Sequence, residues 1–226
     1  MALFTPGAIV SEISGKIAAT VYSRNRGGAV IRNRRTPINR RSVGQSGQRQ
    51  ALASFASSWR GLTQSQRDSW NSATGAFPYQ NKLGETKYLS GAQLYQQFNQ
   101  NSLLIGGSAI TTAPASFAFA TFTATLTAAS TPTMSIAFTP TPMPTDNNLL
   151  VYATGNLSPG ITAPNRSSFR KIGLIADADT SPADVLADYQ AVFGDPVAGQ
   201  KIFVELRPVA ATGQGGTPLR ASAIVS

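Results

Sequence analysis

The stretch that decides the N-terminal fold is "TVYSRNRGGAVIRNRR", residues 20–35. Gly27-Gly28 lies between two short runs that contain β-branched residues, and a Gly-Gly pair in that position is typical of a β-hairpin. Side chains alternate along a strand, so arginines two residues apart are expected on the same face. The pattern therefore predicts a basic hairpin that could display four arginines on one face: Arg24, Arg26, Arg32 and Arg34.

Positive charge is concentrated around this hairpin. Residues 23–41 contain seven Arg, no Lys and no acid. Residues 1–110 hold thirteen Lys/Arg against three acids, a net charge of +10, whereas residues 111–226 hold six against seven, a net charge of −1. This asymmetry indicates two modules with different surfaces, and an acidic partner for the first. The predicted partner-binding residues are Arg24, Arg26, Arg32, Arg34, Arg35, Arg40 and Arg41.

Composition removes several classes of chemistry. The 226-residue chain contains no cysteine and no histidine, which excludes disulfides, zinc sites built on Cys or His, a histidine general base and a cysteine nucleophile. Asp177 and Asp179 are the only close pair among its ten acids, which leaves an enzyme that uses carboxylates alone as a minor alternative, and "DADTSPAD" (residues 177–184) lacks the Gly and Glu of a calcium loop. We therefore expect a protein that is not an enzyme and has no cofactor, metal or catalytic residue. No apolar run is long enough to predict a membrane span.

Two kinds of partner suit an arginine-rich hairpin. The guanidinium group binds carboxylates and phosphates equally well in bidentate geometry, so arginine content alone does not choose between them. A strand-rich arm can add to the edge of another subunit's sheet, which favours a protein partner. Non-sequence-specific nucleic-acid binding is the alternative, although Tyr22 is the only aromatic residue between residues 5 and 54 and no stacking platform is evident. A disordered basic tail is the third interpretation.

Residues 46–105 have the pattern of a small helical unit. "TQSQ" (residues 63–66) and "SGAQ" (residues 90–93) are capping boxes that predict two helix starts. Residues 75–88 are expected to form a loop. Trp59 and Trp70 are expected in the core of the helical unit, and one apolar stripe at helical spacing comprises Leu52, Phe55, Ala56, Trp59 and Leu62.

The rest of the chain has the pattern of a β-sandwich. Residues 106–116 are small and uncharged, as in a linker, and residues 117–226 contain six strand-like runs separated by Pro, Gly and Asn. "SPADVLADYQAVF" (residues 181–193) predicts an inserted helix with Ser181 as its N-cap. The predicted fold is thus α+β and multidomain: a basic arm (1–45), a helical unit (46–105), a linker (106–116) and an immunoglobulin-like sandwich (117–226).

One long neutral stretch bears on assembly. Asp146 is the only charged residue between Lys87 and Arg166. A soluble monomer rarely leaves so much of its surface without charge. Burial against neighbouring subunits, in a homo-oligomer or a many-copy assembly, explains the composition; a tightly packed sandwich with uncharged polar strands is the other explanation.

The C-terminal half resembles fibronectin type III and related immunoglobulin-like domains. The resemblance rests on "GQKIFVELRPVAATGQGGTPLRASAIVS", which is similar to their last two strands, and on "LLVYATGNLSPG", which is similar to an earlier strand. It covers about residues 115–226. Those domains usually have a core tryptophan, and none follows Trp70 here, so Phe138 or Tyr152 is expected to take its place unless the topology differs.

Residues 14–99 resemble small virion-associated proteins of tailed bacteriophages and prophages. The resemblance rests on "GKIAATVYSRNRGGAVIRNRRTPIN", "QRQALASFASSWRGLTQSQRDSW" and "LSGAQLYQQFN". It implies a structural role in a virus particle, location in the virion, other virion structural proteins as partners and no catalytic residue. The expectation is a virion component that is anchored by its basic arm and uses its sandwich for assembly or display.

Overall fold

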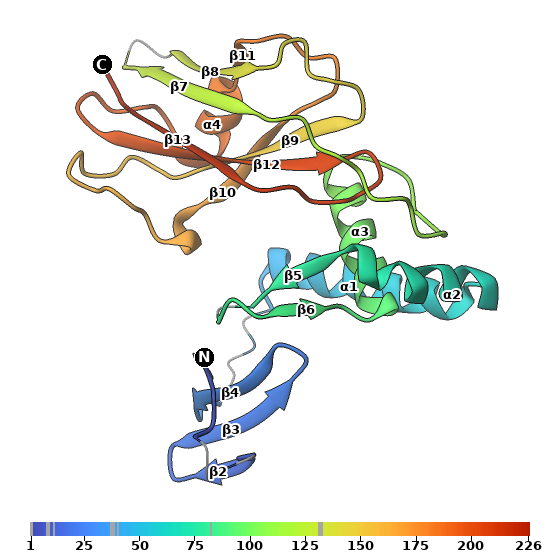
Figure 1. Ribbon diagram of the computed structural model, residues 1–226. Helices are drawn as coiled ribbons and strands as arrows, with labels where there is room; N and C mark the ends of the chain where they lie inside the picture. Colours follow the sequence, from blue (N-terminus) through green and yellow to red (C-terminus); the bar gives the residue numbers. More distant parts are fainter. Residues whose placement is uncertain are drawn as a thin grey trace. The chain divides into compact units, whose positions relative to one another are not determined.

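The computed structural model describes residues 2–7, 10, 12–36, 39, 41–81, 83–130 and 133–226. These residues form four antiparallel sheets and four α-helices (Figure 1), which confirms the predicted α+β class. Contacts group the chain into two compact units. Unit 1 comprises residues 1–96 and 111–115, and unit 2 comprises residues 97–110 and 116–226. Of the helices described, none combines the length and hydrophobicity that crossing a bilayer requires.

The predicted basic hairpin is present as the centre of a larger sheet. The strands β3 and β4 pair in antiparallel register, with Asn25 opposite Gly28 and Arg26-Gly27 as the turn. Gly28 has φ +118°, a conformation that a residue with a Cβ rarely adopts. Two short strands flank the hairpin, in the order β1-β4-β3-β2: β1 (Ala2–Phe4), β2 (Gly15–Ile17), β3 (Thr20–Asn25) and β4 (Gly28–Asn33).

The expected four-arginine face is wrong. Arg24 lies opposite Ala29, and Arg32 lies opposite Val21. In a hairpin with a two-residue turn, facing residues have one odd and one even number, so two even-numbered residues on the two strands fall on opposite faces. Arg24 and Arg32 are therefore on opposite faces, and Arg26 belongs to the turn. The arginines surround the sheet instead of lining one side of it.

Three helices follow this sheet: α1 (Val43–Gly61), α2 (Gln64–Ala73) and α3 (Gly91–Leu104). Both predicted capping boxes are present. Gln66 N–H donates to Thr63 Oγ1 and Thr63 N–H donates to Gln66 Oε1, and Ser90 and Gln93 exchange the same pair of bonds. The prediction of a loop at residues 75–88 is wrong, since β5 (Pro78–Gln80) and β6 (Thr86–Tyr88) form a hairpin there.

Aromatic rings form the core of unit 1. Trp70 is fully buried and its ring meets that of Tyr95 edge-on at 5.5 Å. Trp59 lies at the same distance from Tyr95 but is only half-buried, so the core prediction holds in full for Trp70 and in part for Trp59. The predicted stripe on α1 holds for its second half only, because Leu52 is 48% exposed whereas Leu62 is buried.

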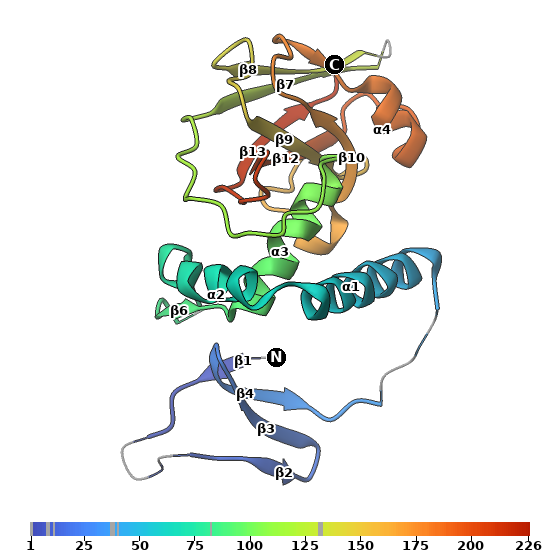
Figure 2. The same cartoon turned by 90° about the vertical axis from the view of Figure 1, so that its right-hand side faces the viewer.

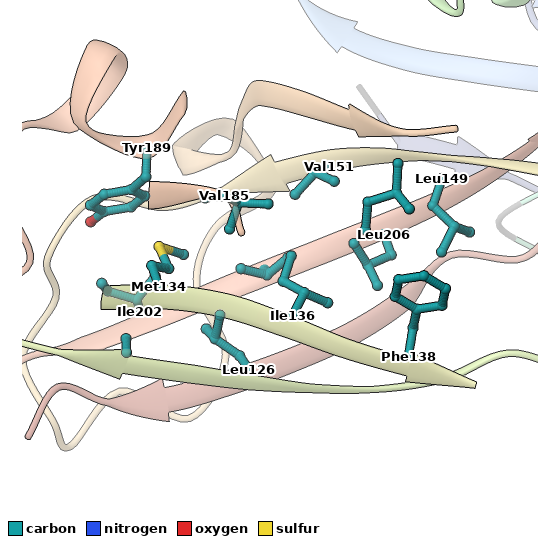
Figure 3. Packing of buried hydrophobic residues seen from close by; sticks show 14 of the residues in the cluster. Leu126, Met134, Ile136, Phe138, Leu149, Val151, Val185, Tyr189, Ile202 and Leu206 are labelled. Carbon is teal, nitrogen blue, oxygen red and sulfur yellow. The ribbon is translucent and has the colours of Figure 1, made fainter. Parts of the chain in front are cut away.

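Unit 2 contains two sheets with a shared core. One sheet has the order β10-β9-β12-β13 and the other has the order β11-β8-β7 (Figure 1). Alternate residues of both sheets point into one hydrophobic cluster, which includes Ile136, Phe138, Val151 and Leu206 (Figure 3). The strands are β7 (Thr123–Ala129), β8 (Thr133–Thr139), β9 (Asn147–Ala153), β10 (Arg170–Ile175), β11 (Ala183–Asp184), β12 (Lys201–Ala210) and β13 (Leu219–Ile224).

The inserted helix exists but begins later than predicted. The helix α4 spans Leu186–Phe193 and lies beside the sheets (Figure 2). Ala183 and Asp184 instead form β11 and pair with β8, so Ser181 is not the N-cap and accepts a hydrogen bond from Phe138 N–H. Tyr189 points from α4 towards the core (Figure 3), where burial raises its pKa to about 12.

The second half of α3 belongs to unit 2 and is held there by the β12–β13 loop and by Lys171 of β10. Asn101 Nδ2 donates to the carbonyl of Gly213 at 2.9 Å, and Lys171 Nζ donates to that of Leu104 at 2.8 Å. Gly213 has φ +78°, and a Cβ at this position would lie 2.3 Å from the Phe98 carbonyl oxygen. The loop therefore approaches the helix closely enough to require glycine.

Candidate partner-binding surface

The predicted partner-binding arginines are exposed in every case that the structure describes. Arg24, Arg26, Arg32, Arg34, Arg35 and Arg41 all have exposed side chains, and Arg40 lies outside the described residues. Within the described chain, ion pairs form at Glu85 and Glu205, and none of them involves these arginines. The basic sheet therefore carries charge that the described part of its own chain does not neutralise.

Arg24 lies in surroundings of mixed charge. A hollow of about 160 Å³ is lined by Arg24 and Lys87 together with Glu12 and Glu85. Hydrogen bonds from Asn81 and then Lys87 hold the pKa of Glu85 below its usual range, and the Lys87 Nζ lies 3.2 Å from Glu85 Oε2. This hollow, called the Arg24 hollow below, thus combines cations with nearby carboxylates.

A second hollow on the same sheet has no acid among the described residues that line it. It has a volume of about 590 Å³ and we call it the Arg32–Arg35 hollow. Among the described residues, two arginines, two polar residues and two apolar residues line it. The lining consists of Ala2, Thr20, Ile31, Arg32, Asn33 and Arg35. This composition suits an anionic ligand that also carries an apolar group.

The β5–β6 hairpin supports the turn of the basic hairpin. Asn81 Nδ2 donates to the Gly27 carbonyl at 2.9 Å, while Asn81 Oδ1 accepts from the backbone N–H groups of Leu83 and Glu85. Asn81 thereby ties the turn at residues 26–27 to a second hairpin. Sequence reasoning missed this contact because it treated residues 75–88 as a loop, and no local signal links Asn81 to a residue 54 positions away.

The aromatic side chains of the basic sheet pack against each other. Phe4 and Tyr22 meet edge-on with ring centroids 5.9 Å apart. Among the described residues of this sheet they are the only aromatic rings. The described part of this sheet therefore offers no series of separate aromatic rings on which successive nucleic-acid bases would stack.

Unit 2 has its own charged cluster, in which one buried carboxylate pairs with two arginines. Glu205 is 2% exposed and accepts from Arg207 Nε at 2.7 Å and Arg220 Nε at 2.8 Å. Burial alone would raise the pKa of Glu205, but the two arginines outweigh it and hold that pKa below its usual range. Arg207 also lies 4.0 Å from the ring centre of Tyr152. The cluster ties β12 to β13 and β9.

Two of the three acids of "DADTSPAD" accept hydrogen bonds from the backbone. Asp179 Oδ2 accepts from Ala176 N–H, and Asp184 Oδ1 accepts from Leu186 N–H. Within the part of the chain that the structure describes, no group of three or more acidic side chains is placed to hold a metal ion.

Comparisons of the chain with family models, curated proteins and solved structures found no match.

Proposed function

We propose that this protein is a non-enzymatic structural component of a tailed-phage virion, anchored through its basic N-terminal sheet to acidic surfaces of neighbouring subunits. The observation that carries the proposal is the set of exposed arginines around this sheet, which have no carboxylate partner among the described residues. The resemblance of residues 14–99 to virion-associated phage proteins agrees with it.

Electrostatics gives the physical reason for an external partner. Like charges held close together on one small sheet repel, and the repulsion destabilises the isolated fold. An acidic surface on another subunit would remove that repulsion and replace the lost hydration with charge-assisted hydrogen bonds. Pairs that become fully desolvated at such an interface lose about 2–5 kcal/mol when one partner is truncated, whereas exposed pairs contribute about 0–1 kcal/mol.

Unit 2 is proposed to be an immunoglobulin-like sandwich used for assembly or display. In such sandwiches the first, second and fifth strands form part of one sheet, and the third, sixth and seventh strands form the other. Unit 2 has this grouping, with its fourth strand, β10, beside the third, β9. Phe138 lies in the shared core whereas Tyr152 does not, so Phe138 is the better substitute for the core tryptophan of these domains.

The anchoring role is tested by reversing charge at Arg32 and Arg34 together. Both side chains are exposed, so we expect the isolated R32E/R34E protein to keep its circular dichroism spectrum and melting temperature. Purified particles from a host that supplies only this variant should lack the protein when assayed by mass spectrometry. Normal incorporation of a folded R32E/R34E chain would overturn the proposal.

A gel-shift titration tests the nucleic-acid alternative. A chain whose main partner is nucleic acid would retard DNA or RNA in the gel at 150 mM salt. Its binding constant would fall steeply as salt rises, because each phosphate contact releases counterions. We expect no such shift, because the proposal assigns the arginines to carboxylates of another subunit, and the described part of the sheet has only Phe4 and Tyr22 as aromatic rings. A strong, salt-dependent shift would favour genome contact over subunit contact.

A further inference from the structure

We propose that an apolar pocket beside the turn of the basic hairpin, called the Leu3 pocket below, receives one large apolar side chain of a neighbouring subunit while a carboxylate of that subunit pairs with Arg32. This inference rests on the proposed function and deepens it, since it names a contact that would make the basic sheet selective among acidic partners. The pocket has a volume of about 340 Å³, and its lining consists of Leu3, Asn25, Gly27, Val30, Tyr79, Gln80 and Asn81.

The Leu3 pocket lies where the β5–β6 hairpin meets the turn of the basic hairpin. Asn81 Nδ2 donates to the Gly27 carbonyl, and a Cβ built on Gly27 would lie 3.8 Å from the Tyr79 hydroxyl. Val30 is 1% exposed, and Leu3 and Tyr79 are half-buried. Apolar walls with a few polar groups, enclosing a volume of this size, are typical of ligand pockets.

The strand register places Arg32 on the same face of the sheet as the pocket. Leu3 lies opposite Val30 in the pairing of β1 with β4, and directly opposite residues share a face. Arg32 is two residues beyond Val30, so its side chain leaves the same face about 7 Å farther along the strand. Lys16 lies opposite Val21, which lies opposite Arg32. A second cation therefore joins Arg32 on this face.

The described strands of the sheet contain no acid that could balance these two cations. Glu12 and Glu85 line the Arg24 hollow instead. Glu85 also accepts from Asn81 at the pocket, but its carboxylate pairs with Lys87. The charge on the face that carries Arg32 therefore favours a carboxylate from another polypeptide and disfavours the basic sheet of a second copy of this chain.

Side chains, and not the main chain, are expected to make this contact. The strand β4 lies between β1 and β3, so it has no free edge to which another strand could add. A partner must instead hold an apolar side chain and a carboxylate about 5–7 Å apart. Residues three or four apart on a helix, or two apart on a strand, have that spacing. The carboxylate would pair with Arg32, and the pocket would select the size of the apolar group.

Fluorescence anisotropy with the full-length protein tests the pocket. The probe is a labelled synthetic peptide, Gly-Glu-Glu-Phe-Glu-Glu-Gly, compared at 50 and 150 mM salt with the same peptide carrying Ala in place of Phe and with a ten-nucleotide oligo(dT). Leu3→Ala removes part of the pocket wall, and Gln80→Trp adds a bulky ring to the lining from an exposed position. The matched control is Leu83→Ala, which removes the same atoms from the Arg24 hollow.

We expect the Phe peptide to bind about tenfold more tightly than the Ala peptide, because only the Phe ring fills the pocket. This preference should disappear in Leu3→Ala and Gln80→Trp and persist in Leu83→Ala, with circular dichroism checking each fold. If Leu3→Ala unfolds, Gln80→Trp decides the outcome. Equal affinities of the wild-type protein for the two peptides, the same loss of preference in Leu83→Ala, or tighter binding of oligo(dT) would overturn the pocket.

The role of Arg32 is tested by comparing Arg32→Gln with Arg24→Gln, because the two side chains leave opposite faces of the sheet. We expect Arg32→Gln to weaken binding of the Phe peptide by about threefold or more, and Arg24→Gln by less than about twofold. Equal losses would contradict the pairing with Arg32. The incorporation of R32E/R34E into particles is measured separately, so its exclusion from particles together with equal affinities for the two peptides would retain the anchor and reject the pocket.

Discussion

At the residue scale, Gly213 carries the contact between the β12–β13 loop and α3. Replacing it with alanine places a Cβ against the Phe98 carbonyl and forces a left-handed conformation on a non-glycine residue. The conformation alone costs about 1–2 kcal/mol. Gly199→Ala is the matched control, because Gly199 has φ +73° and open space around its Cβ position. We expect Gly213→Ala to lower the free energy of unfolding more than Gly199→Ala in urea titrations; equal effects would contradict the close packing.

Glu205 is the residue whose charge matters most inside unit 2. Glu205→Gln leaves Arg207 and Arg220 without a carboxylate at a buried position, and we expect it to destabilise the fold by about 2–3 kcal/mol. Because the folded-state pKa of Glu205 lies below its unfolded value of about 4.3, the pair stabilises the fold fully above that pH. The contribution is lost as pH falls through the folded-state pKa.

Thermal melts from pH 7 to pH 3 check both parts of this prediction. Wild-type protein should lose more stability over this range than Glu205→Gln, since the variant has already lost the pair. Glu85→Gln, at an exposed ion pair, serves as the comparison and should change the melting temperature at pH 7 less. If Glu205→Gln were as stable as wild type at pH 7, the ion pairs of Glu205 with Arg207 and Arg220 would not contribute to stability.

At the element scale, helix starts were predictable where the signal is local. The reciprocal bonds of Thr63 and Gln66 and of Ser90 and Gln93 are set by side chains three residues apart, and both capping boxes form. We expect Thr63→Ala to cost about 1 kcal/mol and Thr63→Ser to cost little, measured by chemical denaturation. Equal losses for both substitutions would mean that the cap bond contributes nothing.

Short strands were less predictable, because whether a short segment forms a strand depends on its pairing with a distant segment. Pro182 and Asp184 have the local pattern of a helix start, yet the pairing of β11 with β8 moves the start of α4 to Leu186. The strands β1, β2, β5 and β6 have three residues each, too few for a periodicity to stand out. Each of these elements forms by pairing with another strand, and the residues of the element itself do not indicate which strand that is.

The candidate binding surface was likewise predictable in its composition but not in its three-dimensional arrangement. Composition alone indicated that the arginines of residues 23–41 lack acidic neighbours in sequence, and the six described ones are exposed without ion pairs. Which arginines share surroundings depends on the register of β3 and β4 and on Glu12 and Glu85. Neither is visible in the sequence around the hairpin, so the difference between Arg24 and Arg32 emerged only from the structure.

At the scale of the whole molecule, the two halves of the chain treat charge differently. In unit 2 the buried Glu205 forms ion pairs with two arginines of its own unit. In unit 1 the arginines of the basic sheet face solvent. We propose that a surface of another protein supplies the carboxylates that pair with the arginines of unit 1.

A side-chain-resolution cryo-EM reconstruction of the assembled particle tests this claim most directly. We expect carboxylates of a different polypeptide within about 4 Å of the guanidinium groups of Arg32 and Arg35. A map in which these groups contact only water, genome phosphates or carboxylates of their own chain would contradict it.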